Sequence, residues 1–303
     1  MVAAGSLEIG AVQAFIQYLR QFNQPISQIA NIANILQSTV AAAERVFELL
    51  DETEQIPDTK TPKTLNHIDG SVAFRHVSFG YSSEKILIKD LNMEIKSGDT
   101  IAIVGPTGAG KTTLVNLLMR FYEINSGGIY VDGIKTTEFT RSYLRNIFGM
   151  VLQDTWLFQG TIRENLAYGK ESATEEEIIS AAKAAHAHSF IKLLPGGYDF
   201  VLNEEASNIS QGQKQLLTIA RAILKDPDIL ILDEATSSVD TRTEVLIQKA
   251  MNNLMKGRTS FVIAHRLSTI RDATNILVMK DGDIVEQGNH KSLMEQNGFY
   301  ANL

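Results

Sequence analysis

The sequence predicts an α/β fold: a mostly parallel sheet with a small antiparallel β-subdomain and a helical subdomain, preceded by a long N-terminal helix. Four short apolar runs without alternation predict parallel strands, because such strands are covered on both faces. These runs are residues 100–104, 229–232, 261–264 and 276–279. Helical patterns separate the runs, and this alternation is typical of α/β domains.

Two further patterns complete the predicted architecture. Three stretches alternate more strongly between apolar and polar residues and predict the antiparallel β-subdomain; they lie near residues 71–79, 86–95 and 127–131. Residues 161–225 are mostly helical in pattern, so the helical subdomain is expected at about 155–225.

The composition is that of an ordinary globular protein. The chain has 303 residues, of which 44% are hydrophobic and 21% charged, enough for one large core or two smaller ones. The net charge of −7 disfavours a nucleic-acid partner. The absence of cysteine excludes disulfides, thiolate metal sites and cysteine nucleophiles, and suits a reducing compartment. The first residues lack a basic region followed by an apolar one, so no secretory signal is expected.

Residues 9–50 contain a single proline, Pro25, and predict a long helix of about 60 Å. Polar side chains recur along it at three- and four-residue steps: Gln13, Gln17, Arg20, Gln21, Gln24, Gln28, Asn31 and Ser38. Two interpretations are open: an amphipathic surface helix, or a membrane helix whose polar stripe faces a water-filled pathway. No stretch reaches the roughly 18 apolar residues of a simple membrane span.

Residues 51–70 are polar and proline-containing, and predict a linker to a domain at 71–303.

A glycine-rich loop follows the apolar run that ends at Val104. Its eight residues match G-x-x-x-x-G-K-[ST]: Gly105, Pro106, Thr107, Gly108, Ala109, Gly110, Lys111 and Thr112. The glycines let backbone N–H groups converge on phosphate oxygens, and a helix from about Lys111 to Phe121 points its positive end at the anion. Lys111 is expected to reach the β- and γ-phosphates of ATP, and Thr112 to bind Mg²⁺. Thr113 is counted with the nucleotide-binding residues. The strand–loop–helix context disfavours a chance glycine-rich turn.

Two acids end the apolar run at residues 229–232. Asp233 is expected to bind magnesium through water, and Glu234 is a candidate general base for the attacking water. An isolated Asp-Glu pair often merely caps a strand end. The apolar run before the pair and the upstream phosphate loop favour the catalytic interpretation.

Together with further segments in the same order, these motifs resemble the ATP-binding cassette (ABC) family across residues 71–303. Ile209–Gln213 resembles the LSGGQ signature, and the run MVLQDTWLFQGTIRENL around Gln153 resembles the Q-loop. Ser237-Ser238-Val239-Asp240 is similar to the D-loop, His265 to the switch histidine, and Tyr81 to the aromatic A-loop residue. Alone, His265 would more often be structural and Tyr81 would more often be a packing residue; the order and spacing of these motifs around the phosphate loop reverse those interpretations.

The resemblance implies a role for each residue. Gln153 would contact the metal and the attacking water and relay movement to the membrane domain, while Tyr81 would stack on adenine and His265 would contact the γ-phosphate. Ser210 and the Gly212 backbone lie at a predicted helix N-terminus, where they can form an anion-binding concavity. In the family this concavity completes the nucleotide site of the opposite subunit, so two cassettes would sandwich two ATP molecules and hydrolysis would require dimerisation. The nucleotide-binding residues expected there are Ser210, Gln211, Gly212, Gln213 and Asp240.

Residues 9–50 resemble the last transmembrane helix of exporter half-transporters and its cytoplasmic extension. The resemblance implies a membrane location with the ATPase on the cytoplasmic side, a transmembrane domain of the same transporter and a second ABC subunit as partners, and a chain that is a fragment. The cargo would be a drug, lipid or peptide. Its identity would depend on membrane helices that lie outside residues 9–50.

The chain departs from the family pattern in its signature. Gln211 replaces a glycine, Ile209 replaces a leucine, and residues 203–207 lack the usual glycines. One hypothesis makes the chain the hydrolytically competent half of a heterodimer; a homodimer that tolerates the glutamine is the alternative.

Two rival functions remain at this point. Chromosome-maintenance and DNA-repair ATPases share the phosphate loop and signature, but they insert a long coiled coil where this chain has only about 100 residues without sustained heptads. A regulatory cassette that binds ATP without hydrolysing it is disfavoured by Glu234 and His265.

Overall fold

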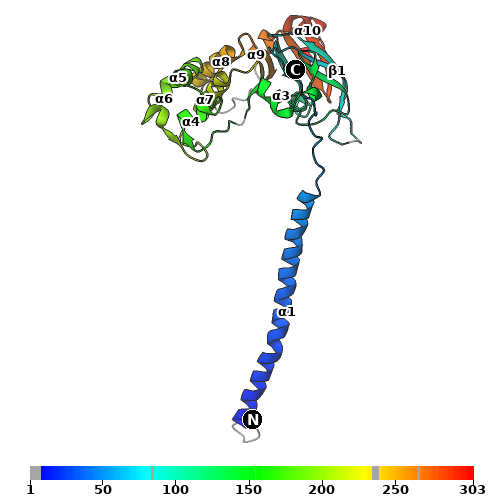
Figure 1. The fold of residues 1–303 in the computed structure, drawn as a ribbon, viewed down its shortest axis with the longest axis vertical. Helices are drawn as coiled ribbons and strands as arrows, with labels where there is room; N and C mark the ends of the chain where they lie inside the picture. The colour runs from blue at the N-terminus through cyan, green and yellow to red at the C-terminus, as the bar shows by residue number, and fades with distance from the viewer. Residues whose placement is uncertain (1–7, 83–84, 154, 234–238, 265–266) are drawn as a thin grey trace. The chain divides into compact units, whose positions relative to one another are not determined.

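The structure, a computed structural model, describes residues 8–82, 85–153, 155–233, 239–264 and 267–303. The chain divides into two compact units, Met1–Pro57 and Asp58–Leu303. The first unit consists of helix α1, Ile9–Leu50, which continues through Pro25 and has no buried residue (Figure 1). The expected long helix is therefore confirmed. Among the helices of the described residues, none combines the length and the apolar character that crossing a membrane requires.

The second unit begins inside the stretch expected as a linker. Asp58 accepts hydrogen bonds from the backbone N–H and the Nη1 atom of Arg141, at 3.1 and 2.8 Å. The backbone N–H of Leu65 donates to the Tyr143 hydroxyl at 2.9 Å. The stretch from Asp58 onward is thus attached to the domain that follows it.

The main sheet has six strands in the order β12-β11-β3-β10-β9-β6, all parallel to their neighbours except β12, which pairs antiparallel with β11. The strands are β3 Thr100–Val104, β6 Phe148–Val151, β9 Ile229–Asp233, β10 Thr259–Ile263, β11 Asn275–Lys280 and β12 Asp283–Gly288. The four predicted parallel strands are all present. The sequence analysis did not identify β6 and β12.

Alternate residues of the central strands face two different hydrophobic clusters. Ile101 and Ile103 of β3 lie in one cluster, and Ala102 and Val104 lie in the other. Strand β9 divides in the same way, with Ile229 and Ile231 on one side. Both faces are therefore covered, which explains why these runs are apolar without alternation.

The smaller sheets are antiparallel. The four-stranded sheet has the order β2-β1-β4-β5, with β1 Val72–Phe79, β2 Ile88–Ile95, β4 Ser126–Val131 and β5 Ile134–Lys135. This sheet is the expected antiparallel β-subdomain. A two-stranded pair, β7 Gly160–Thr161 with β8 Val201–Leu202, was not expected.

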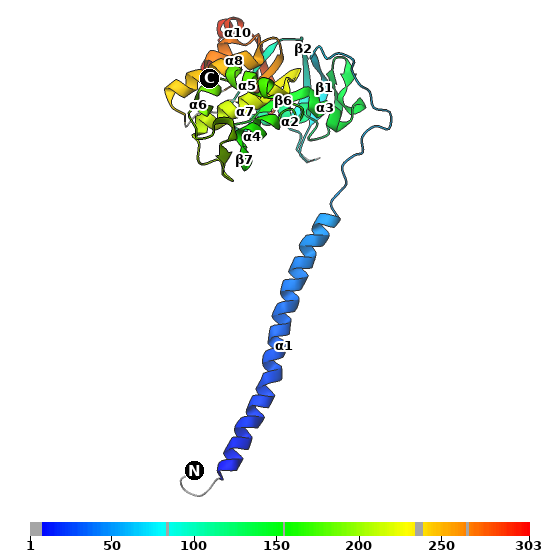
Figure 2. The ribbon, with the colours of Figure 1, turned by 60° about the vertical axis from the view of Figure 1, so that its left-hand side comes forward.

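The helices of the second unit gather mainly between β6 and β10 in the sequence. They are α2 Lys111–Leu118, α3 Arg141–Ile147, α4 Ile162–Ala167, α5 Glu175–Ala184, α6 His188–Ile191, α7 Gln211–Lys225, α8 Thr241–Met255, α9 Leu267–Asp272 and α10 His290–Gln296. Short 3-10 helices are Thr136–Glu138, Gly197–Asp199 and Tyr300–Asn302. Figure 2 shows α4 to α7 and β7 at one end of this unit and β1 and β2 at the other, as the predicted subdomains require.

Helix α2 is shorter than expected. It ends at Leu118 rather than near Phe121, because Arg120 adopts a left-handed conformation with φ of 52° that a helix cannot continue through.

Candidate nucleotide site

The glycine-rich loop joins β3 to α2, as the motif predicts. Gly105 has a φ of 150°, and a Cβ atom at this position would lie 2.2 Å from the backbone oxygen of Met279 in β11. Only glycine fits this close approach. Helix α2 then starts at Lys111, with Gly110 at its N-cap, so its N-terminal N–H groups are directed into the loop.

Lys111 lies folded over the loop. Its Nζ atom donates hydrogen bonds to the backbone oxygens of Gly105 and Pro106, at 2.8 and 3.0 Å. Burial lowers the pKa of Lys111 below the ordinary lysine value, and the nearby Asp233 carboxylate acts in the opposite direction. The loop carbonyls therefore hold a partly desolvated cation beside the glycine-rich loop.

A pocket of about 390 Å³ brings the predicted residues of four separate segments together. Its lining residues are Tyr81, Leu87, Thr107, Gly108, Gly110, Lys111, Thr112, Thr113, Gln153, Asp233 and Ile263. One cavity therefore contains candidate residues from the A-loop, the phosphate loop, the Q-loop and the strand-end acid pair. The sequence analysis missed Leu87 and Ile263, which carry no chemical signal beyond being apolar.

The same pocket contains oxygen donors of the kind that a hard divalent cation prefers. Thr112, Gln153 and Asp233 contribute a hydroxyl, an amide oxygen and a carboxylate. Within the described part of the chain, no group of three or more His, Cys, Asp and Glu side chains is placed to hold a metal by itself. A hydroxyl, an amide oxygen and a carboxylate are oxygen ligands that suit Mg²⁺, which keeps waters and substrate phosphates in its coordination shell.

Tyr81 lies at the rim of this pocket with half of its surface exposed. Its hydroxyl forms a 2.9 Å hydrogen bond with the Thr113 hydroxyl. Its ring packs edge to face against Phe79 and Tyr122, with 5.0 Å between centroids in each pair. Tyr122, which the sequence analysis did not single out, therefore helps to fix the orientation of the Tyr81 ring.

The signature residues lie at the start of α7 and do not line this pocket. Ser210 is the N-cap of α7: its hydroxyl accepts from the Gln213 N–H, and the Gln213 side chain accepts from the Ser210 N–H at 2.9 Å. This reciprocal capping gives Gln213 a structural role within its own helix. Gln211, next to Ser210, donates from its Nε2 atom to the Thr155 hydroxyl at 3.1 Å.

Gly212 and Asp240 connect the start of α7 to α8. A Cβ atom on Gly212 would lie 2.4 Å from Thr243 and 2.9 Å from Val239, so the two helices meet where only glycine fits. Asp240 is the N-cap of α8 and accepts from the Thr243 N–H at 3.0 Å. That hydrogen bond lowers the pKa of Asp240. Asp240 does not line the pocket in its own chain.

Some predicted residues lie outside the described residues: Glu234, Ser237, Ser238 and His265. Their proposed roles remain predictions from sequence.

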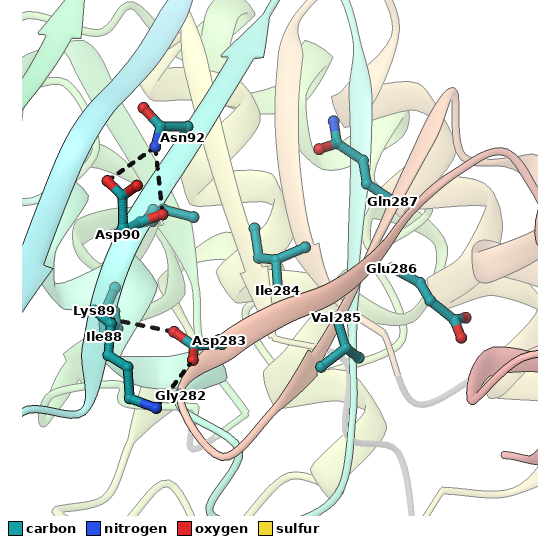
Figure 3. A pocket seen from close by; sticks show the side chains of 11 residues that line it. Ile88, Lys89, Asp90, Asn92, Gly282, Asp283, Ile284, Val285, Glu286 and Gln287 are labelled. Atoms are coloured by element: carbon teal, nitrogen blue, oxygen red, sulfur yellow. Dashed lines mark hydrogen bonds and ion pairs between the residues drawn. The ribbon is translucent and has the colours of Figure 1, made fainter.

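A second groove, of about 450 Å³, lies between β2 and β12 and contains no residue of the predicted motifs (Figure 3). Lys89 and Asp283 connect its two sides, because the Asp283 carboxylate accepts from the Lys89 backbone N–H at 3.3 Å and lies 3.7 Å from its Nζ atom. The groove therefore does not compete with the motif-bearing pocket as the nucleotide site.

Comparison with known proteins agrees with this geometry. The family described as ABC transporter matches residues 88–237. The chain is 57% identical over 302 residues to a fatty acid ABC transporter ATP-binding/permease protein of Mycobacterium bovis, covering 100% of this chain and 48% of that protein. It is 47% identical over 302 residues to an ATP-dependent lipid A-core flippase of Desulfotalea psychrophila, covering 100% of this chain and 53% of that protein.

A solved structure is similar over nearly the whole chain. It is a bacterial Atm1-family ABC exporter with ATP bound, with a TM-score of 0.78 and 38% identity over 98% of this chain and 52% of that one. The chain spans about half the length of the curated relatives it matches.

Proposed function

The chain carries a domain of the ABC transporter family, and from this premise we propose that it is the ATP-hydrolysing part of an exporter. One observation carries the proposal: a single pocket gathers the phosphate loop with Tyr81, Gln153 and Asp233. These residues come from four segments of the sequence, and each has a chemical role in holding Mg-ATP.

Lys111 and the loop amides would bind the phosphates. The ammonium group of Lys111 would exchange its bonds to the Gly105 and Pro106 oxygens for phosphate oxygens. The N-terminal end of α2 adds its N–H groups and partial positive charge. Tyr81 would stack on adenine, with its ring held by Phe79 and Tyr122.

Thr112, Gln153 and Asp233 would hold Mg²⁺, directly or through water. The ion would neutralise charge that develops on the phosphate oxygens. Gln153 would also orient the attacking water.

Hydrolysis needs a base and a γ-phosphate contact, for which we assign Glu234 and His265. Glu234 would accept a proton from the water while the water oxygen attacks the γ-phosphorus. The bond between the γ-phosphorus and the oxygen that bridges it to the β-phosphorus would then break. His265 would donate a hydrogen bond to the γ-phosphate.

The signature would act on the nucleotide of a second ABC subunit. Ser210 and the start of α7 lie outside the pocket of their own chain, which supports a role in trans for Ser210, Gln211, Gly212 and Asp240. Two subunits would close head to tail on two ATP molecules. We infer that the second subunit is either an identical chain or a homologous one.

The proposed exporter resides in the cytoplasmic membrane with its ATPase domain on the cytoplasmic side. Helix α1 would continue a transmembrane domain of the same transporter, and its polar stripe would then face a water-filled pathway. The relatives named for fatty acid and for lipid A-core favour a lipid among the drug, lipid and peptide cargoes.

The direct test is phosphate release from Mg-ATP by the purified chain. We expect turnover by the unsubstituted chain and its loss in Glu234→Gln, with Mg-ATP binding retained. Glu205→Gln, a change to an exposed acid outside the pocket, is the matched control and should keep full turnover. Undiminished hydrolysis by Glu234→Gln would exclude it as the base, and ATP binding without any turnover would indicate a regulatory cassette.

A further inference from the structure

The side chain of Gln211 links the signature to the Q-loop of its own chain. Its Nε2 atom donates to the Thr155 hydroxyl at 3.1 Å, although the two residues are 56 positions apart in the sequence. Gln211 is the first residue of α7, and Thr155 follows Gln153 by two positions. A glycine, which the family signature has at this position, has no side chain to form this hydrogen bond.

The two residues of this hydrogen bond each lie beside a residue assigned to a different nucleotide site. Gln153 lines the pocket of its own chain. Ser210, the neighbour of Gln211, is the residue assigned above to the nucleotide of the partner subunit. A displacement of the start of α7 would act on the Q-loop through this one side chain.

The segment after Thr155 is fixed to the same helix by a partly buried network. Arg221, ten residues further along α7, donates to the backbone oxygen of Trp156 at 3.2 Å and to that of Asn165 at 2.9 Å. Asn165 is fully buried and donates to the Phe158 backbone oxygen at 2.9 Å. Burial lowers the pKa of Arg221, which is consistent with a guanidinium withdrawn from water.

The two attachments differ in how easily they break. The Arg221 network is charged and partly buried, with Asn165 fully buried at its centre, so breaking its bonds to Asn165 would leave buried polar groups without partners. The bond between Gln211 and Thr155 is neutral and exposed, so water can replace it. The Q-loop therefore has a fixed attachment downstream of Thr155 and a releasable one beside Gln153.

The start of α7 also packs closely against α8. Gly212 packs so closely on Thr243 and Val239 that a Cβ atom would clash. These contacts oppose a movement of this turn toward α8, whereas the link from Gln211 to Thr155 that the described residues show is a side-chain hydrogen bond.

We propose that Gln211 is a positioning residue that couples the partner's nucleotide, bound by Ser210, to the placement of Gln153 in its own pocket. This regulation rests on the proposed ATPase function and deepens it. The coupling makes hydrolysis in one site depend on whether the signature of the same chain is engaged with the other nucleotide.

Trp156 provides a readout that needs no nucleotide. It is the single tryptophan of the chain, it follows Thr155 directly, and it is 62% exposed. The variants are Gln211→Ala, Thr155→Val, which removes the hydroxyl at nearly constant shape, and Thr155→Ser, which keeps it. We expect the first two to change acrylamide quenching of Trp156 equally, the double variant to change it no further, and Thr155→Ser to match the unsubstituted chain.

Mg-ATP turnover gives the second readout. We expect Gln211→Ala and Thr155→Val to lower kcat about two- to tenfold, the factor that the net free energy of one neutral hydrogen bond produces. Thr155→Val leaves the signature intact and should do so with KM unchanged. Thr155→Ser should restore kcat. Thr218→Val removes another hydroxyl from α7, one that donates only to the Lys214 backbone oxygen, and should leave both readouts unchanged.

The outcomes separate the inference from the function beneath it. Hydrolysis by the unsubstituted chain together with unchanged quenching and kcat in Thr155→Val would overturn the coupling alone. Additive effects of Gln211→Ala and Thr155→Val would also overturn it, because the two residues would then act independently. No hydrolysis by the unsubstituted chain would overturn the proposed function and the coupling with it.

Discussion

The Nζ atom of Lys111 lies 2.8 Å from the backbone oxygen of Gly105, the residue that begins the phosphate loop. The side chain thus bends back over its own loop and satisfies carbonyls that would otherwise line the pocket. A bound phosphate would compete with these carbonyls for the ammonium group, so affinity for ATP depends on how strongly this cation prefers the anion.

Lys111→Ala is expected to remove most affinity for Mg-ATP, because it deletes the pocket's lysine ammonium group while leaving the loop backbone unchanged. Isothermal titration of the chain with Mg-ATP would measure the loss, which we expect to be at least about a hundredfold for a desolvated ionic contact. Lys89→Ala removes an exposed lysine outside this pocket and should bind as the unsubstituted chain does. Retained tight binding by Lys111→Ala would contradict the phosphate-loop assignment.

Affinity for Mg-ATP is expected to fall at alkaline pH. Burial lowers the pKa of Lys111 from the ordinary 10.5, and the phosphates attract only its charged form. Affinity should therefore be complete below the lowered pKa and decrease as the pH rises through it, before an ordinary lysine would lose its proton. Lys111→Arg stays charged across this range. A titration of the dissociation constant against pH should show the fall in the unsubstituted chain and not in Lys111→Arg; equal curves would contradict the prediction.

Asp58 is expected to stabilise the second unit. Its carboxylate accepts from Arg141 at 2.8 Å and lies 3.5 Å from Arg120, and both arginines are buried. Asp58→Asn should lower the free energy of unfolding by about 2 to 3 kcal/mol, less than for a fully buried pair because Asp58 is a third exposed. Urea unfolding would measure it.

Glu138→Gln is the matched control for this prediction. It breaks the ion pair between Glu138 and Lys63, two side chains that are each about half exposed, and should lower the free energy of unfolding much less than Asp58→Asn does. An equal effect of the two substitutions would indicate that burial of the arginines is not what makes Asp58 important.

Gly212→Ala is expected to destabilise the second unit, although alanine favours helices over glycine. Propensity alone would stabilise α7 by up to about 1 kcal/mol. The new Cβ atom would instead lie 2.4 Å from Thr243, and such overpacking costs about 1 to 3 kcal/mol. Urea unfolding should show the net loss, and adding Thr243→Ala should recover part of it. A higher free energy of unfolding for Gly212→Ala than for the unsubstituted chain would show that α8 moves enough to accommodate the new Cβ atom.

The parallel strands were predictable because their burial is two-sided. In β3, neighbouring residues such as Ile103 and Val104 contribute to two different hydrophobic clusters. Because both faces of the strand are buried, its residues form an unbroken apolar run in the sequence. The phosphate loop was predictable because its motif lies within eight consecutive residues and its glycines Gly105, Gly108 and Gly110 all adopt positive φ, which is a local backbone requirement.

Other features depend on partners far away in the sequence. The polar stretch that begins near Asp58 reads as a linker, yet Asp58 contacts Arg141, 83 residues later. The signature and Q-loop motifs mark their two segments separately, but neither motif indicates that Gln211 bonds to Thr155. Strand β12 is half exposed along its length, so it lacks the apolar run that revealed its neighbours.

The solution mass of Glu234→Gln, measured by light scattering with and without Mg-ATP, tests the central claim most directly. A variant that binds ATP without hydrolysing it should accumulate the closed state, in which each signature faces the nucleotide of the other subunit. The account predicts a shift from monomer to dimer that requires Mg-ATP and is lost when Lys111→Ala is added. A monomer that persists at saturating, demonstrated ATP binding would contradict a sandwich formed by two copies of this chain.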